Sequence, residues 1–144
     1  MTNEEFWRKL DQLTPTGSDP DNIRRFAQVL KQGYEQDLDL LVTGKLQGDQ
    51  FNQAYIMSPH GRVLLCFTSD MHAAAFRAYG YDGYPAVCCL VKVRIIMNNM
   101  FNKESIAGLV FNPRDANHAT AVPKFLLEQI MPGPRLKPEK KVAP

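Results

Sequence analysis

The pattern of apolar and polar residues at 53–80 indicates strand, turn, strand and helix, and the rest of the chain is organised around this stretch. Residues with high β-propensity lie on both sides of a Pro-His-Gly turn at 59–61, with the longer run at 63–67. This pattern predicts two strands joined by a tight turn. The Thr-Ser-Asp at 68–70 then ends the second strand and offers side-chain caps for an alanine-rich helix.

Two amphipathic helices are predicted before this stretch. Residues 3–13 carry apolar side chains at i, i+1, i+4 and i+7, and Trp7 in that stripe is expected to pack the helix onto the body. Asp19 followed by Pro20 is typical of a helix start, and we expect the second helix to end at Gly33. The resulting helical hairpin either covers a sheet face or presents a surface to a partner.

The stretch after residue 80 indicates further core strands. Residues 86–93 form a nearly continuous apolar run, which predicts a strand buried on both faces. Residues 94–103 either continue this strand or form a short helix. Residues 106–111 predict another core strand, which an Asn-Pro pair closes. Residues 36–51 form either a strand or a last helical turn, because the apolar run is too short for its periodicity to distinguish the two.

The C-terminal part of the pattern contains a short edge strand at 119–122 and a final helix that begins at Pro123. We expect Phe125, Leu126 and Ile130 to face inward on this helix.

The predicted elements define an α+β fold: a single domain with a mixed β-sheet and flanking helices, preceded by an N-terminal helical pair. Residues 1–35 are expected to be a helical extension packed on the body, and residues 36–131 the α/β domain. Residues 132–144 lack the apolar side chains needed for a core and are expected to be a disordered basic tail.

Composition and charge restrict the class of protein. The 144 residues are 44% hydrophobic, which suits one domain with its own core. The formal net charge is +2, but the last ten residues carry +3, so the rest of the chain sums to −1. A near-neutral body argues against a nucleic-acid-binding protein, in which the folded surface carries the basic excess. No apolar run is long enough for a membrane span, so no membrane association is expected.

Cysteine usage and the N-terminus point to the cytoplasm. Cys66, Cys88 and Cys89 lie in apolar runs, and their odd number without CxxC spacing argues against a disulfide framework. Free thiols packed in a reducing compartment are the simpler interpretation. Charged residues interrupt the first 11 positions, so a signal peptide is not expected there.

No motif of catalysis, metal binding or nucleotide binding is visible. His60, His72 and His118 show none of the paired spacings of a zinc site, and we expect surface or helix-capping roles for them. Neither Ser58 nor Ser69 lies in a GxSxG motif, and the glycines form no phosphate-binding loop. We therefore assign no catalytic, cofactor-binding or metal-binding residue from the sequence.

The segment at 79–85 carries Tyr79, Tyr81 and Tyr84 among glycines and a proline. Tyrosine-rich loops suit recognition, because each ring offers broad apolar area and a hydroxyl at little entropic cost. The alternative is that these rings fold back over the edge of the core.

Three segments together resemble the N-terminal domain of the SseB family, which is named after enhanced serine sensitivity. They are VLLCFTSDMHAAAF at 63–76, IAGLVFNP at 106–113 and VPKFLLEQI at 122–130, in that order. The resemblance covers roughly residues 36–131. It implies a bacterial, cytoplasmic α/β domain without an established catalytic activity. In this pattern Thr68 and Ser69 cap a helix, while Asn112 and Pro113 end a core strand.

Our first hypothesis is a non-enzymatic, SseB-like interaction domain of accessory, adaptor or immunity type that binds a protein partner and no cofactor. The partner surface is predicted at two loops that carry Tyr79, Tyr81, Tyr84, Asn112, Arg114 and Asn117. The alternative is a small-molecule sensor or enzyme, in which the tyrosines line a pocket and the histidines converge on it. Self-association through a sheet edge, giving a homo-oligomer, is a third option.

Overall fold

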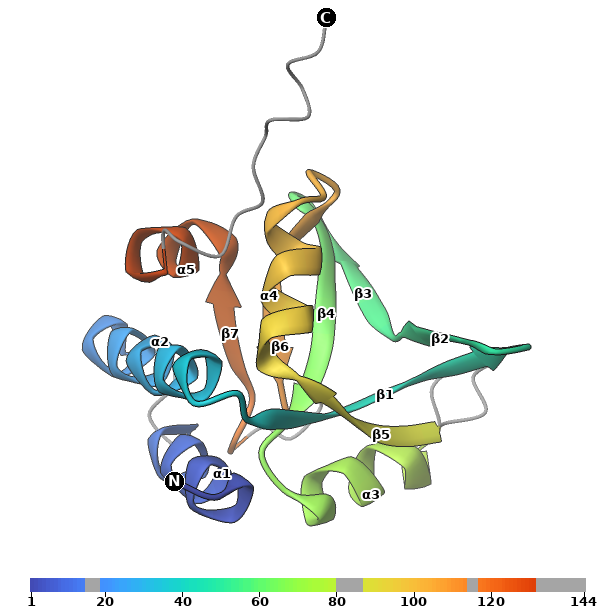
Figure 1. Cartoon of the computed structure of the whole chain (residues 1–144), viewed down its shortest axis with the longest axis horizontal. Helices are drawn as coiled ribbons and strands as arrows, with labels where there is room; N and C mark the ends of the chain where they lie inside the picture. The colour runs from blue at the N-terminus through green and yellow to red at the C-terminus, as the bar shows by residue number, and fades with distance from the viewer. Residues whose placement is uncertain (15–18, 80–86, 114–116, 132–144) are drawn as a thin grey trace, which may run out of the picture.

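The order of helices and strands follows the predicted pattern (Figure 1). The computed structural model describes residues 1–14, 19–79, 87–113 and 117–131. In chain order its elements are α1 (Asn3–Leu13), α2 (Pro20–Glu35), β1 (Asp39–Gln47), β2 (Gln50–Gln53), β3 (Tyr55–Ser58), β4 (Gly61–Phe67), α3 (Asp70–Tyr79), β5 (Val87–Lys92), α4 (Val93–Phe101), β6 (Ile106–Phe111), β7 (Thr120–Pro123) and α5 (Lys124–Ile130). This is an α+β fold with an N-terminal helical pair, as the sequence predicts.

The strands of the described residues form one mixed sheet in the order β2-β1-β4-β6-β7, with β3 paired to β4 and β5 paired to β1. The pair β4–β6 is parallel, and the other pairs are antiparallel. In the parallel register Cys66 lies opposite Phe111, so both strands end at the same edge of the sheet. Residues that follow the two strands are therefore brought together, and this edge positions the candidate site.

The core occupies both faces of the sheet because side chains alternate along each strand. Leu64 and Cys66 of β4 face the larger cluster, which α1, α2, α4 and α5 complete. Leu65 and Phe67 face a smaller cluster that includes Ala73 of α3. Figure 1 shows α4 alongside β4 and in front of β6, with α2 and α5 at its left, α1 below α2, and α3 below β5.

The N-terminal helices belong to the main core. Phe6 and Phe26 are fully buried, and the ring of Phe26 meets that of Phe111 edge-on with centroids 4.8 Å apart. Trp7 packs α1 onto the body, as predicted, and its Nε1 donates a hydrogen bond to the Asp39 carbonyl at 2.9 Å. Asp19 caps α2 through the N–H of Asp21, which confirms the predicted helix start.

Gly33 does not end α2, contrary to the prediction, because the helix continues to Glu35. The glycine is instead required by packing. A Cβ at this position would lie 2.3 Å from Cζ of Phe6, so only a residue without a side chain lets α1 approach α2 this closely. The chain turns afterwards at Asp37, which has a φ of 59°.

Two predictions about burial were wrong. β5 pairs only with β1 among the described strands, and its Leu90 is 51% exposed, so it is an edge strand and not a central one. Phe125 is 64% exposed, whereas Leu126, Leu127 and Ile130 form the buried face of α5.

The two segments whose structure the sequence left open are now assigned. Residues 94–103 are mostly helical, as part of α4, and residues 39–53 form the β1–β2 hairpin.

In the part of the chain that the structure describes, there is no helix of the length and apolar character that a bilayer crossing requires. The predicted tail at 132–144 lies outside the described residues.

Candidate functional site

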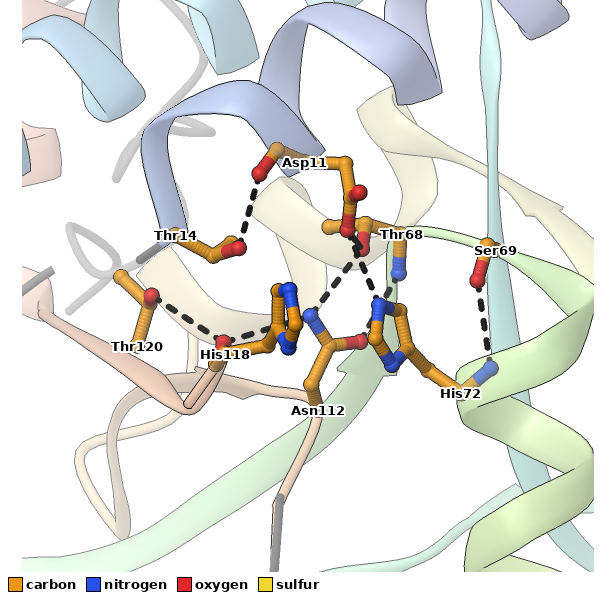
Figure 2. Close-up of polar contacts among 8 residues, drawn as sticks. All are labelled: Asp11, Thr14, Thr68, Ser69, His72, Asn112, His118 and Thr120. Carbon is orange, nitrogen blue, oxygen red and sulfur yellow. Dashed lines mark hydrogen bonds and ion pairs between the residues drawn. The ribbon is translucent and has the colours of Figure 1, made fainter. Parts of the chain in front are cut away.

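Three segments that are far apart in the sequence meet at the edge where β4 and β6 end (Figure 2). Asp11 comes from the last turn of α1, and His72 from the first turn of α3. His118 comes from the connection between β6 and β7. We refer to Asp11, His72 and His118 as the Asp–His cluster.

The carboxylate of Asp11 is the centre of the cluster. Its Oδ1 lies 2.9 Å from Nε2 of His72 and accepts a hydrogen bond from the Thr68 hydroxyl at 2.7 Å. The His72 side chain is 13% exposed and that of Asp11 is 38% exposed. The imidazole is thus sheltered, while the carboxylate stays accessible from solvent.

His72 is held in place by the start of its own helix. Its backbone N–H donates to the Ser69 hydroxyl at 3.1 Å, so Ser69 caps α3 as predicted. Thr68 was also expected to cap this helix, and that expectation was wrong. Its hydroxyl donates to Asp11, and its backbone N–H donates to the Oδ1 of Asn112 at 3.1 Å.

Asn112 connects the two halves of the site. Its Nδ2 donates to the Thr68 hydroxyl at 3.0 Å and to the His118 carbonyl at 3.3 Å. One side chain therefore contacts the residue that orients Asp11 and also the backbone of a histidine. Metal sites commonly have such supporting hydrogen bonds around their ligands.

The backbone of Asn112 adopts a left-handed conformation with a φ of 53°. Asparagine tolerates this region better than other residues with a Cβ. The residue is 1% exposed, so surrounding structure holds it there. The left-handed turn directs the chain away from β6, and Pro113 follows it. The prediction that Asn112 and Pro113 end a core strand is confirmed.

His118 completes the cluster. Its ring lies beside that of His72, with centroids 4.7 Å apart and planes tilted by 46°. Its carbonyl accepts hydrogen bonds from Asn112 and, at 3.4 Å, from the Thr120 hydroxyl. Backbone contacts thus fix the start of β7, and the His118 ring extends toward Asp11 and His72 (Figure 2).

The cluster provides the donor set of a transition-metal site. One ligand atom from each of its residues lies within 4.8 Å of the other two. In a tetrahedral zinc site with bonds of about 2.0–2.2 Å, donor atoms lie roughly 3.3 Å apart. Closing the cluster around an ion therefore needs side-chain movements of about 1.5 Å or less, within the reach of rotamer adjustments.

Burial makes Cys66 a poor candidate for a nucleophile. Cys66 is buried in β4, and its burial raises the pKa of the thiol to about 12. The thiol therefore stays protonated at neutral pH and is a poor nucleophile. Burial, with a smaller effect of Cys88, also raises the pKa of Cys89, which lies half-buried in β5.

Only some residues of the partner surface predicted from the sequence are among those that the structure describes. Asn117 is exposed beside His118, but Asn112 is buried and is therefore removed from that surface. Tyr79 ends α3. Tyr81, Tyr84 and Arg114 lie outside the described residues.

The surface or helix-capping roles expected for the three histidines do not describe His72 and His118, which lie in one cluster. His72 and His118 converge, whereas His60 lies in the β3–β4 turn, where its N–H donates to Ser58 Oγ at 3.2 Å. Sequence reasoning missed Asp11, which was considered only as one of the charged residues that interrupt the N-terminus. The available signal was its position four residues after Trp7, which puts it beside the inward stripe of the helix.

Comparisons with known proteins do not extend these observations: no protein-family model, curated protein or solved structure matches the chain. The resemblance to the SseB family therefore stays a prediction.

Proposed function

We propose that the protein is an accessory domain that binds a zinc ion through Asp11, His72 and His118. The observation that carries this proposal is the convergence of two imidazoles and one carboxylate from three separate segments. Asp11 and His72 alone are 61 positions apart in the sequence.

The donor chemistry favours zinc over magnesium or calcium. Magnesium and calcium prefer oxygen ligands, whereas imidazole nitrogen suits zinc and other late first-row metals. The supporting hydrogen bonds also fit a metal site. Thr68 orients the Asp11 carboxylate, and Asn112 fixes the backbone of His118. Such outer partners position ligands before the ion binds.

A zinc ion in the cluster would connect α1 to the ends of β4 and β6. Asp11 is the contribution of the N-terminal helical pair, while His72 lies on α3, which follows β4, and His118 lies in the connection after β6. Tyr79 is on the same helix as His72, and Asn117 precedes His118. Zinc binding would therefore restrain both segments of the predicted partner surface. In this proposal the protein is non-enzymatic, and the ion prepares its surface for a protein partner.

A second candidate function is zinc-dependent hydrolysis. The observation that favours it is the number of ligands, because three protein ligands leave a coordination position for water, as in catalytic zinc sites. Hydrolysis of a model ester or phosphodiester by the zinc-loaded protein, lost in a His118→Ala variant, would support this candidate. A zinc-loaded protein without such activity supports the accessory role.

The proposal is tested by zinc titration of untagged protein after treatment with a chelator, using isothermal calorimetry or a competing chromophoric chelator. We expect one ion per chain. His118→Ala should weaken binding by more than about 100-fold, because it removes a ligand and not only a supporting partner. Affinity should also fall as the solution is acidified, since the coordinating nitrogens must be unprotonated.

His60→Ala is the matched control, because His60 lies outside the cluster in an exposed turn. This variant should bind zinc as the unaltered protein does. Circular dichroism of each variant checks that the fold is retained. Absence of binding, or equal affinity in His118→Ala and the unaltered protein, would contradict the proposal.

A further inference from the structure

A polar cavity of about 490 Å³ lies between α4 and the strands β1 to β4. The residues that matter for its chemistry are Lys45, Phe51, Tyr55, Arg62, Asn99 and Lys103. None of the three proposed zinc ligands is among the residues that line it. Its volume is in the range of small-molecule sites, which is roughly 300–1,000 Å³.

The lining of this cavity is cationic. Lys45 comes from β1, Arg62 from β4 and Lys103 from the segment just after α4. No carboxylate is found among the lining residues that the structure describes. Cationic side chains from separate elements around one cavity give it a positive potential, which attracts an anionic ligand.

Arg62 is already positioned for a ligand. Its Nη2 donates to the Ser105 hydroxyl at 2.7 Å, and its backbone N–H donates to the Ser105 carbonyl at 2.8 Å. The guanidinium lies over the ring of Tyr55, 5.1 Å from the centroid. A guanidinium held in this way loses less freedom on binding, and its remaining N–H groups match the oxygens of a phosphate.

The rest of the lining carries no charge and includes two aromatic rings. Phe51 and Tyr55 add aromatic surface, and both pack against the main core, which restricts their movement. One face of the Tyr55 ring is covered by the Arg62 guanidinium. Asn99 of α4 adds an amide that can donate and accept hydrogen bonds. A ligand that combines a phosphate with a planar ring would use both the charged and the aromatic parts of the cavity.

We infer that this cavity binds a small phosphorylated molecule with a planar ring, of the size of a nucleoside monophosphate. The phosphate contacts Arg62 and Lys103, and the ring packs against Phe51 and Tyr55. This site is separate from the Asp–His cluster and does not depend on zinc.

The test is an NMR titration of ¹⁵N-labelled protein with adenosine monophosphate, adenosine and inorganic phosphate in turn, in the presence of a chelator. The chelator prevents phosphate from binding through zinc, so this result and that of the zinc titration are independent. We expect saturable shifts at the lining residues with adenosine monophosphate. Adenosine and inorganic phosphate should each bind at least about tenfold more weakly, because each lacks one of the two groups that the cavity recognises.

Two variants test whether Arg62 and Lys103 contact the phosphate of the ligand. Arg62→Gln and Lys103→Gln should each weaken binding by about tenfold or more, because each removes a charged partner of the phosphate. Lys103 is exposed, so its substitution keeps the test valid even if Arg62→Gln disturbs the fold. Arg24→Gln is the matched control, since it removes the same charge from the exposed face of α2. No saturable shift with adenosine monophosphate, or an unchanged affinity in Lys103→Gln, would overturn the inference.

Discussion

Replacing Asn112 with alanine removes the side chain that connects the two halves of the candidate site. Three hydrogen bonds are lost: one accepted from the Thr68 N–H, and two donated to the Thr68 hydroxyl and the His118 carbonyl. Thr68 is 1% exposed, so water cannot readily replace the lost acceptor. Alanine must also adopt the φ of 53° that asparagine tolerates.

The cost of Asn112→Ala can be worked out from these contacts. An unsatisfied buried N–H costs about 1–3 kcal/mol, and the two donated bonds contribute about 1 kcal/mol in net terms. The left-handed conformation adds roughly 1 kcal/mol for alanine. We therefore expect a loss of about 4 kcal/mol in the free energy of unfolding. Glycine adopts this φ without strain, so Asn112→Gly should lose about 1 kcal/mol less.

Urea unfolding in the presence of a chelator measures both variants without a contribution from metal. With an m-value of roughly 2 kcal/mol per molar urea, Asn112→Ala should lower the unfolding midpoint by about 2 M. Asn117→Ala is the control, because this asparagine is exposed in the same connection, and it should cost less than about 1 kcal/mol. If Asn112→Ala stays within about 1 kcal/mol of the unaltered protein, the network does not hold the site. Equal losses for alanine and glycine would refute the contribution of strain.

Three further predictions concern residues outside this network. Gly33→Ala places a Cβ 2.3 Å from Cζ of Phe6. This overpacking should outweigh the gain in helix propensity and lower the free energy of unfolding, measured with urea, by about 1–2 kcal/mol. A stabilised variant would contradict the close packing of α1 on α2. Cys66 should not react with a thiol reagent at neutral pH until the chain unfolds. Burial raises the pKa of the Cys66 thiol from 9.0 to about 12 in the folded state. Between these two pH values the thiol ionises in the unfolded chain only, so the free energy of unfolding should fall as the pH rises from 9 to 12. Trp7→Phe should cost about 1 kcal/mol in urea unfolding through the lost bond to the Asp39 carbonyl, and an unchanged stability would show that this bond contributes nothing.

Local patterns in the sequence were sufficient to predict most elements. Residues 53–80 predicted β3, β4 and α3, because β-forming residues, a turn and helix-capping residues follow one another there. Asp19 and Pro20 predicted the start of α2, since capping depends on neighbouring residues only.

Burial that depends on distant neighbours could not be predicted in this way. The apolar residues of β5 indicated a central strand, yet the edge position of β5 follows from its pairing with β1 alone among the described strands. Gly33 looked like a helix end, and its true role depends on Phe6, a residue of another helix. Neither relation is recorded in the local sequence.

The candidate site was missed for the same reason. Parallel pairing of β4 with β6 brings Thr68 and Asn112 to one edge, and no short motif encodes that register. Asp11 reaches this edge only because α1 packs against the body. The separate roles of Ser69 as a cap and Asn112 as a strand end were predictable, because both are local.

The central claim is that two imidazoles and one carboxylate bind zinc. X-ray absorption spectroscopy of the zinc-loaded protein tests it most directly, because it reports the donor atoms around the ion. The proposal predicts a first shell of nitrogen and oxygen at about 2.0 Å, with the outer scattering of two imidazole rings and no sulfur. A shell with sulfur at about 2.3 Å, or one without imidazole scattering, would contradict it.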